Sequence, residues 1–382
     1  MTTAKIPSTA IDFLFLNEED MYAAGVTDIA QCVDVMEETL VLLAQGDYKM
    51  AGLDSNSHGA MITFPEEPQF AGMPKDGPDR RFMAMPAYLG GRFNNTGVKW
   101  YGSNAENRMA GLPRSIHTFV LNDTVTGAPK SIMSANLLSA YRTGAVPGVG
   151  VKLFARESAT TLAVIGPGVM GRTTTEACLA LRPGITTIKI KGRSERGVTK
   201  FATWALEKFP EVEVIAVDSV EEATKDADIV VAATTTDAAG SEAFPFFKKS
   251  WIKPGATLLL PAAARFDDDF LQGEVRLVVD YMGLYDAWAE EYGTNAYQLL
   301  GIPGTHWHDM VRSGELERDK IQQIGDICSG NVQGRNDDSE IFLYSVGGMP
   351  VEDVAWATQI YENALDKGIG TSLNLWESPR LA

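Results

Sequence analysis

Short apolar runs alternate with amphipathic segments through the middle of the chain. Residues 162–165 form a β-branched apolar run of strand length, and residues 172–181 behind it have helical content. The alternation continues as far as residue 279, with further strand-length runs at 187–191, 212–217, 228–234, 256–260 and 275–279. Runs that are apolar at every position are typical of strands buried on both faces, as in parallel sheets. The pattern predicts a doubly wound α/β domain.

A different pattern precedes this region. Residues 29–43 carry apolar side chains at helical spacing and stop near Gly46. Three later segments have the pattern of strands, and the last of them ends in a turn-rich stretch that predicts a hairpin; they are 82–89, 96–102 and 116–121. Residues 134–151 are small and helical, whereas residues 63–81 are rich in Pro, Gly and charge and predict a loop.

The first strand of the α/β region runs into a G-x-G-x-x-G motif. Gly166 allows a tight turn, Gly168 lets a pyrophosphate approach the backbone, and Gly171 lets the next helix pack on the strand. That helix presents unpaired N–H groups to the phosphates, and Val169 and Met170 in the same turn are expected at the same site. Because strand, glycines and helix come in the required order, a dinucleotide site is predicted rather than a parallel sheet that binds no nucleotide.

The end of the second strand indicates which dinucleotide is bound. NAD sites usually have Asp or Glu about 20 residues beyond the glycines, which bonds the ribose 2′-hydroxyl. Here the stretch is Lys191-Gly192-Arg193-Ser194, and the first acid is Glu195. Arg193 and Ser194 suit charge-assisted bonds to a 2′-phosphate. We therefore predict NADP(H) rather than NAD(H), with solvated loop residues as the alternative.

Composition and charge narrow the class of protein. The chain has 382 residues, of which 45% are hydrophobic and 22% charged, as expected for a soluble protein of two domains. It has no apolar run of membrane-spanning length and no secretion signal at its start. The three cysteines are far apart, which favours a reduced, cytoplasmic protein. A net charge of −17 without a basic patch argues against a nucleic-acid partner.

Motifs spread over most of the chain carry a family resemblance. They are Leu16-Asn17-Glu18-Glu19-Asp20, Val98-Lys99, Arg142-Thr143-Gly144-Ala145, Val164-Ile165-Gly166-Pro167-Gly168, residues 325–330, 334–335 and 340–347, and Glu352-Asp353. With these motifs the chain resembles the ornithine cyclodeaminase/mu-crystallin family. That family includes cyclodeaminases, ketimine reductases, alanine dehydrogenases and opine-type amino acid dehydrogenases.

The resemblance implies an α/β fold in which a Rossmann dinucleotide-binding domain is inserted in a discontinuous α+β domain. Residues 1–145 and 336–382 would form the domain that binds substrate and makes a homodimer. Residues 146–335 would form the Rossmann domain.

The resemblance also implies where the site residues lie. Lys99 and Arg142 would face the substrate, and four further positions would lie beside the cofactor: Thr143, Thr234, Val346 and Gly347. A guanidinium binds a carboxylate bidentately, and a nearby lysine polarises a carbonyl or acts as an acid when its pKa is suitable. The structural alternative for Arg142 is a surface ion pair.

Two departures from the family pattern bear on the activity. Cyclodeaminases carry an Asp shortly after the strand at 257–260, where this chain has Pro261-Ala262-Ala263-Ala264 and no side chain that relays a proton. Cyclising deamination is therefore disfavoured. Relatives usually have an Arg near residues 55–58, where this chain has His58, which is either a general acid or base or a structural imidazole. His117, on a neighbouring apolar strand, is expected to be a hydrogen-bonded core histidine.

Residues 281–308 form an aromatic insertion that contains Trp288, Tyr292, Tyr297 and Trp307. These side chains would line a wider substrate pocket or pack in a dimer interface, and we favour the interface. His306 and His308 share one face only on a strand, and no third ligand is evident, so no metal site is predicted.

The function that the resemblance implies is NADP-dependent oxidation or reduction at CH–NH or CH–NH2 groups. The substrate would be a small amino acid, imine or amine, with Arg142 on its carboxylate and Lys99 polarising or protonating it. One alternative is an ammonia-releasing cyclodeaminase. The other is a non-catalytic, cofactor-binding partner of an amine oxidase, because some longer bacterial relatives that resemble this chain at Asn56-Ser57-His58-Gly59 carry a name that links them to tyramine oxidase.

Overall fold

The strand-length apolar runs of the middle region form a parallel sheet. The computed structural model describes residues 9–234 and 240–381. Eight of its strands lie in the order β10 (Glu213–Ala216), β9 (Thr187–Lys191), β8 (Thr161–Ile165), β11 (Ile229–Ala232), β13 (Thr257–Leu260), β17 (Ile341–Ser345), β15 (Val275–Val279) and β16 (Ile321–Gln323). Neighbouring strands in this sheet pair in parallel. The first five have the 3-2-1-4-5 order of a Rossmann fold, so the predicted doubly wound α/β sheet is confirmed.

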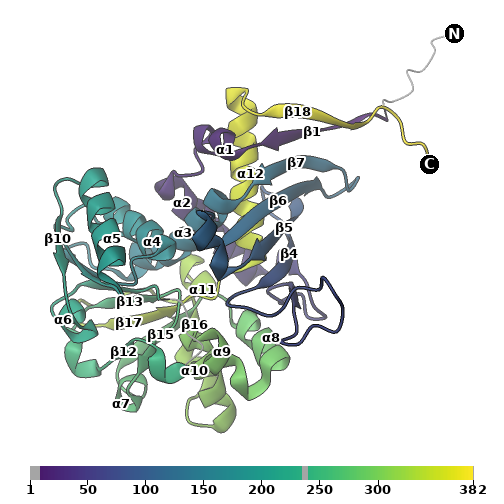
Figure 1. Cartoon of the computed structure of the whole chain (residues 1–382). Coiled ribbons are helices and arrows are strands. Elements are labelled where there is room, and N and C mark those ends of the chain that lie inside the picture. Colours follow the sequence, from purple (N-terminus) through teal and green to yellow (C-terminus); the bar gives the residue numbers. More distant parts are fainter. Residues whose placement is uncertain (1–8, 235–239, 382) are drawn as a thin grey trace.

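Helices α3 (Asn136–Phe154), α4 (Val169–Leu181) and α5 (Glu195–Lys208) cover one face of the parallel sheet, and α6 (Val220–Thr224) and α7 (Asp268–Leu271) lie on the other side (Figure 1). The two-residue strands β12 (Phe246–Phe247) and β14 (Arg265–Phe266) pair beyond its edge. Strands β8, β11 and β13 are buried at almost every position. Their apolar character along the whole run follows from cover on both faces.

The structure differs from the predicted domain boundaries at two places. Strand β17 pairs with β13 and β15 inside the parallel sheet, whereas the boundary at 335/336 assigns it to the other domain. All five β17 residues are buried, so the strand needs neighbours on both edges and faces. Helix α3 runs across the boundary at 145/146 as one continuous helix.

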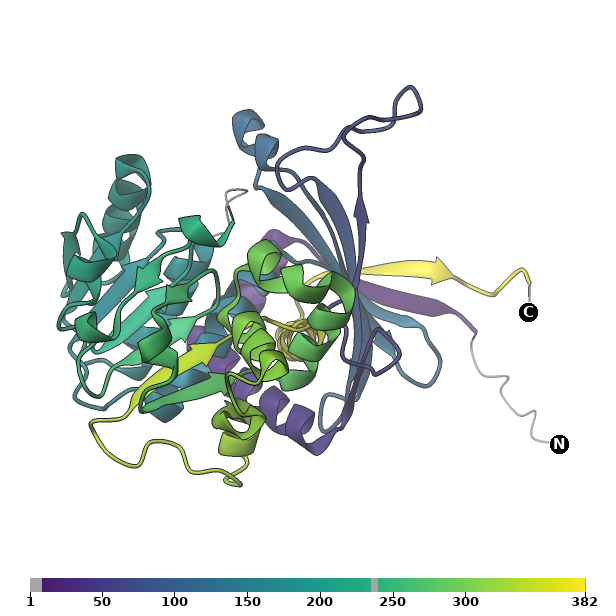
Figure 2. The same cartoon turned by 90° about the horizontal axis from the view of Figure 1, so that it is seen from below.

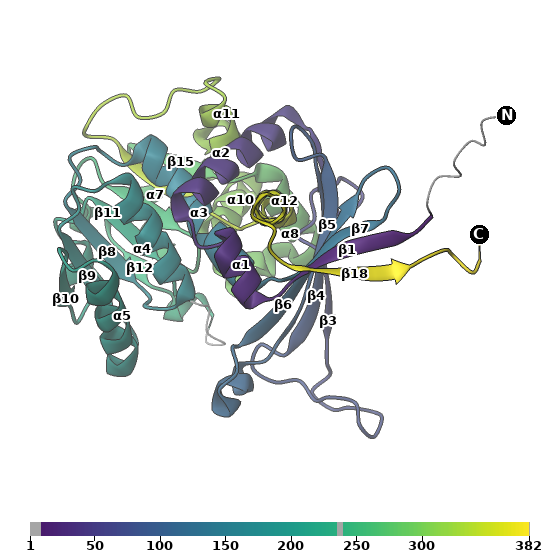
Figure 3. The same cartoon turned by 90° about the horizontal axis from the view of Figure 1, so that it is seen from above.

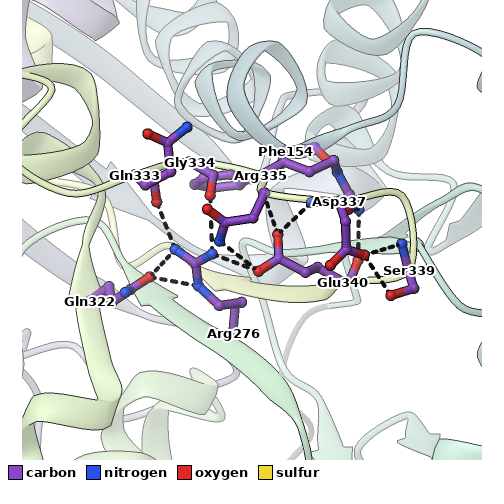
Figure 4. Close-up of polar contacts among 10 residues, drawn as sticks. Phe154, Arg276, Gln322, Gln333, Gly334, Arg335, Asp337, Ser339 and Glu340 are labelled. Atoms are coloured by element: carbon purple, nitrogen blue, oxygen red, sulfur yellow. Dashed lines mark hydrogen bonds and ion pairs between the residues drawn. The ribbon is translucent and has the colours of Figure 1, made fainter.

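Two arginines hold the irregular connection between α11 (Ile324–Cys328) and β17 (Figure 4). Arg276 donates to Oε1 of Gln322, to Glu340 and to the carbonyls of Gln333 and Gly334. Arg335 donates to the carbonyls of Phe154, Gly255, Asp337 and Glu340. This connection has no strand ladder of its own, so the two arginines satisfy its backbone oxygens and hold the segment that leads into β17.

A second, mixed sheet is built from the two ends of the chain. Its strands lie in the order β18 (Thr371–Trp376), β1 (Ile11–Leu16), β7 (Pro129–Ser134), β6 (Ser115–Asp123), β5 (Asn95–Ser103), β4 (Arg81–Leu89) and β2 (Tyr48–Met50), with β3 (Ala60–Thr63) also on β4. Strands β1 and β7 pair in parallel, and the other neighbours are antiparallel. The hairpin predicted at 122–127 joins β6 to β7.

Helix α12 (Pro350–Lys367) packs on one face of the mixed sheet and contacts β4 and β5. Figure 3 shows it end-on, surrounded by α1 (Glu18–Ala24), α2 (Ile29–Gln45) and α3. Helix α2 begins after its cap Asp28 and is followed by Gly46 in the left-handed region. The predicted helix over 29–43 and its end near Gly46 are confirmed. In the described chain no helix lies over the opposite face of the sheet (Figures 2 and 3).

The aromatic insertion forms the helices α8 (Met282–Tyr292), α9 (Ala296–Leu300) and α10 (Pro303–Ser313). Four of its aromatic side chains are buried within this one chain, namely Tyr285, Trp288, Tyr297 and Trp307. They are therefore core, and the favoured interpretation as dimer-interface side chains does not hold for them. Residues two apart on a helix point in different directions, so His306 and His308 have different neighbours. His306 stacks on Tyr297 with ring centroids 4.8 Å apart, and His308 Nε2 lies 2.9 Å from Asp286 Oδ1.

Short elements complete the described chain. They are the 3-10 turns at Ala105–Ala110, Ser241–Ala243, Lys249–Trp251, Gly293–Asn295 and Arg318–Lys320. Among the helices in 9–234 and 240–381, none combines the length and the apolar character that a membrane crossing requires.

Candidate functional site

Strand β8 runs into α4 through the predicted glycine turn. Gly166 has φ +112°, and a Cβ there would lie 2.6 Å from the backbone of Ala233 at the end of β11. A Cβ on Gly171 would lie 2.1 Å from the carbonyl oxygen of Gly166. At Gly168, by contrast, no heavy atom of the described residues comes within 4 Å of that position. The chain is therefore tightly packed at Gly166 and Gly171, where helix and strands meet, and leaves free space at Gly168, where a pyrophosphate would approach.

The N-terminus of α4 suits an anion. Gly168 is its cap residue, and no side chain in the described ranges caps its first N–H groups. Val169 at the first helical position is 64% exposed. Thr234, just beyond β11, has a buried hydroxyl without a hydrogen-bond partner among the described residues. Uncapped N–H groups at a helix start and an unpaired buried hydroxyl nearby fit a bound dinucleotide.

The residues predicted to bind a 2′-phosphate lie beyond the next strand of the sheet, β9. Arg193 and Ser194 are exposed and follow the carboxyl end of β9. The Ser194 hydroxyl caps α5 by accepting from the backbone N–H of Gly197 at 3.2 Å. The serine is therefore partly committed to the helix, and the positive charge for a phosphate contact comes from Arg193.

Lys99 and Arg142 meet two acids at the start of α12. Alternation along β5 turns Lys99 towards α12, where its Nζ lies 2.8 Å from Asp353 Oδ2. Arg142 on α3 donates from Nε to Asp353 Oδ1 at 3.0 Å and from Nη1 to Glu352 Oε2 at 2.7 Å. All four side chains are at most 7% exposed. The surface ion pair considered for Arg142 is therefore excluded by its burial.

The balance of charge explains how this cluster tolerates burial. Two cations face two acids, and a buried ion pair that loses one partner costs about 3–5 kcal/mol. Glu352 and Asp353 also lie in the first turn of α12, where the helix dipole favours negative charge. The cluster ties β5, α3 and α12 together across more than 200 residues of sequence.

Burial shifts the pKa values of the cluster. It lowers the pKa of Lys99 to about 8, helped by Arg142 and opposed by Asp353. It raises the pKa of Glu352 to about 7, which Arg142 opposes. Burial also acts to raise the pKa of Asp353, but Arg142 and Lys99 outweigh it and hold that pKa below its usual value. Near neutral pH, Lys99 and Asp353 are thus an ion pair, whereas Glu352 is close to its titration point.

A cavity of about 80 Å³ joins this cluster to the glycine turn. Its lining comes from α3, α4, α12 and the ends of β13 and β17: Arg142, Thr143, Val146, Met170, Pro261, Val346, Gly347, Gly348 and Glu352. The cavity therefore brings together Arg142 from the predicted substrate side and Thr143, Met170, Val346 and Gly347 from the predicted cofactor side.

Asp280 shapes the wall of the cavity. This buried residue follows β15, and its Oδ2 accepts from the N–H groups of Gly347 at 2.7 Å and Gly348 at 3.0 Å. Its Oδ1 accepts from the backbone of Tyr281 and the hydroxyl of Tyr285. Four donors on one carboxylate hold the turn after β17 in a single conformation.

His58 lies at the edge of the cluster. Its ring is 5.7 Å from that of Trp288, and burial together with Lys99 and Arg142 lowers its pKa to about 3. The imidazole is therefore neutral at pH 7, which excludes the imidazolium as a general acid and leaves a neutral donor or acceptor.

His117 differs from the expected hydrogen-bonded core histidine. Its Nδ1 is buried without a partner in the described structure, and its ring packs edge-on against Tyr101 at 4.7 Å. Burial, followed by the charge of Lys99, lowers its pKa to about 4.

Three acids of the site were not predicted as site residues. Glu352 and Asp353 are part of a family motif, but their pairing with Lys99 and Arg142 depends on the tertiary fold. The signal that points to them is two adjacent acids at the start of α12, whose other residues there are apolar. Asp280 is an acid directly after a buried strand, which is a position typical of ligand sites in parallel sheets. Within the described ranges, no group of three His, Cys, Asp or Glu side chains is placed to hold a metal ion.

Comparison with known proteins places the chain among amino acid and imine oxidoreductases. Residues 25–368 match the ornithine cyclodeaminase/mu-crystallin family. The chain is 26% identical to the N-((2S)-2-amino-2-carboxyethyl)-L-glutamate dehydrogenase of Staphylococcus aureus, over 96% of this chain and 99% of that one.

Two solved structures show the same fold. One is the Δ1-pyrroline-2-carboxylate reductase of Thermococcus litoralis in complex with NADH and L-proline, with a TM-score of 0.74 and 24% identity over 94% of this chain and 99% of that one. The other is an archaeal alanine dehydrogenase dimer with bound NAD, with a TM-score of 0.73 and 24% identity over 96% and 100%.

Proposed function

Because the chain belongs to the ornithine cyclodeaminase/mu-crystallin family, we propose that it is an NAD(P)H-dependent oxidoreductase that reduces the C=N bond of an imine or, in reverse, dehydrogenates an amino acid or secondary amine. One observation carries the proposal: a single cavity is lined by the Arg142 guanidinium and by the glycine turn at Met170. Carboxylate recognition and dinucleotide binding therefore meet at one point. The dehydrogenase from S. aureus, which aligns over nearly its whole length, supports the same reaction class.

In this proposal the residues of the cluster have different roles. A dinucleotide with its pyrophosphate at the glycine turn would supply or accept the hydride through its nicotinamide. The ion pairs with Glu352 and Asp353 fix the plane of the Arg142 guanidinium, which is then oriented to bind a substrate carboxylate through two further N–H donors. Lys99, held by Asp353, places a positive charge beside the reacting group. Pro261, directly after β13, adds an apolar wall to the cavity and so helps to exclude water from it.

A substrate panel tests this function. The purified protein is mixed with NADPH or NADH and with cyclic ketimines, or with 2-oxo acids plus amines, and the nicotinamide absorbance is followed. Turnover of carboxylate-bearing imines is expected. Formation of proline from ornithine without added cofactor would instead identify a cyclodeaminase. Nucleotide binding without turnover of any imine would favour a non-catalytic partner of an amine oxidase.

The cofactor is proposed to be NADP(H). The stretch after β9 is Lys191-Gly192-Arg193-Ser194, without the acid that binds an NAD ribose, although the two solved structures contain NADH and NAD. Arg193→Ala is expected to weaken NADPH binding about tenfold or more, because a charge-assisted hydrogen bond contributes about 1.5–3 kcal/mol. NADH binding should change little. Fluorescence titration with both nucleotides measures this, with the exposed Lys200→Ala as a matched control; equal losses for NADPH and NADH would refute the assignment.

The protein is further proposed to be a homodimer that associates through the open face of the mixed sheet. Phe82, Trp100 and Ile116 on β4, β5 and β6 are 40%, 41% and 50% exposed there, and the Phe82 and Trp100 rings stack. A sheet with an apolar outer face needs a second layer, and a second copy of this chain provides it. The mixed sheet with α12 would then serve both substrate binding and dimerisation.

Trp100→Glu is expected to convert the dimer into a monomer, because the charge would be buried without a partner. The particle mass from light scattering measures this. Leu206→Glu, which places the same charge at a 48% exposed position on α5 in the other half of the molecule, should leave the mass unchanged. A wild-type monomer, or a Trp100→Glu dimer, would contradict the proposed interface.

A further inference from the structure

Glu352 has one carboxylate oxygen that the fold leaves unused. The side chain is fully buried, and its Oε2 accepts from Arg142 Nη1 at 2.7 Å. Its Oε1 is also buried but has no hydrogen-bond partner among the described residues. An unpaired buried acceptor is destabilising. Such an atom is satisfied either by a proton on the carboxyl group or by a donor from a bound ligand.

The other acids nearby have no such spare oxygen. Asp353 binds Lys99 through one oxygen and Arg142 through the other. Asp280 uses both of its oxygens on four donors. Among the nine residues that line the cavity, Glu352 is the one acid. A donor that enters the cavity beside Arg142 and Gly347 therefore meets the carboxyl group of Glu352.

We infer that Glu352 is the catalytic residue that exchanges the proton on the substrate nitrogen. This inference rests on the proposed function and names a residue for one step of it. In the oxidative direction, the Glu352 carboxylate takes one proton from the substrate ammonium. The freed lone pair forms the C=N bond as the carbon gives up its hydride to the oxidised nicotinamide. The substrate thus loses one proton and one hydride, and Glu352 passes its proton to solvent. In reduction the steps reverse, and Glu352 returns the proton to the amine nitrogen that forms when the hydride adds to the carbon.

The surroundings of Glu352 bring its pKa close to neutral pH. Burial raises its pKa to about 7, Arg142 opposes the shift, and Asp280 and Asp353 add to it. Other ionisable groups that interact with it come from β5, α2, α8 and β17: Lys99, Cys32, Tyr285 and Tyr344. Because the base must be deprotonated, kcat for oxidation is expected to rise with pH through about 7.

Two variants test the role by kinetics. Glu352→Gln is expected to lower kcat for oxidation about 100-fold or more and to remove the rising limb near pH 7, since general acid–base catalysis contributes about 10²–10⁴-fold. Glu352→Asp keeps the charge and should restore part of the rate with a displaced limb. The inference is overturned if the Gln variant binds the cofactor and keeps both the wild-type kcat and the rise of its rate near pH 7. If the Gln variant does not fold, an Asp variant with unchanged kcat and limb overturns it.

A second measurement is independent of turnover. Infrared difference spectra of the pure protein, recorded between pH 5.5 and 8.5, are expected to show a buried carboxylic acid that ionises near pH 7 and is absent from Glu352→Gln. A spectrum that is the same in both proteins overturns the assignment. If the band disappears in the variant but the wild type turns over no imine or amine, the proton site stands and the proposed function fails, so that the two outcomes are distinguished.

Discussion

Replacing Arg142 by Lys is expected to lower kcat/KM for a carboxylate-bearing substrate by about 100- to 1,000-fold, or about 3–4 kcal/mol of transition-state stabilisation. Lysine keeps the positive charge but has no planar fork, so it cannot bind Glu352, Asp353 and a substrate carboxylate in the same geometry. Initial rates over a range of substrate concentrations measure the loss.

The control for this variant is a substrate that lacks the carboxylate. Turnover of the corresponding amine should fall far less than turnover of the amino acid, and the nucleotide titration should be unchanged. Arg156→Lys is a matched variant, because Arg156 pairs with Asp228 at the amino end of β11, away from the cavity. Equal losses for both substrates would mean that Arg142 supports the fold and does not bind the substrate.

The local parts of the fold could be predicted from the sequence because each depends on neighbouring residues. The glycine turn at 166–171 and strand β9 are where the periodicity predicts them. The position of β17 depends instead on pairing with strands that lie far away in the sequence. An apolar run shows that a strand is buried, but not between which strands it lies.

The candidate site divides in the same way. Lys99 and Arg142 were identified through motifs, and the structure brings both to the start of α12. Their partners lie more than 200 residues further along the chain, so no local pattern could reveal that Asp353 binds both cations. The predicted interface role of the aromatic insertion is wrong for a related reason. Aromatic composition is the same for a core and for an interface, and only the packing of Trp288 and its neighbours separates the two.

Replacing Lys99 by Met is expected to lower kcat about 100- to 10,000-fold, because the active site loses the positive charge that polarises or protonates the substrate. Burial lowers the pKa of Lys99 to about 8, so the wild-type rate should fall as the pH rises through 8. Lys99→Arg keeps a cation beside Asp353, since a guanidinium stays protonated in this range. In that variant the falling limb should disappear, even if the rate at pH 7 is reduced. Rate profiles between pH 6 and 10 distinguish the three proteins.

Titration of Lys99 cannot cause the fall in rate above pH 8 by unfolding the protein. The folded pKa of Lys99 is lowered to about 8, and that of an unfolded lysine is about 10.4. Between these values the unfolded chain binds more protons than the folded one, so this group makes the free energy of unfolding increase with pH. Activity that falls above pH 8 while the melting temperature does not fall therefore reports the charge of Lys99 in the site. A falling limb that persists in Lys99→Arg would assign the titration to another group.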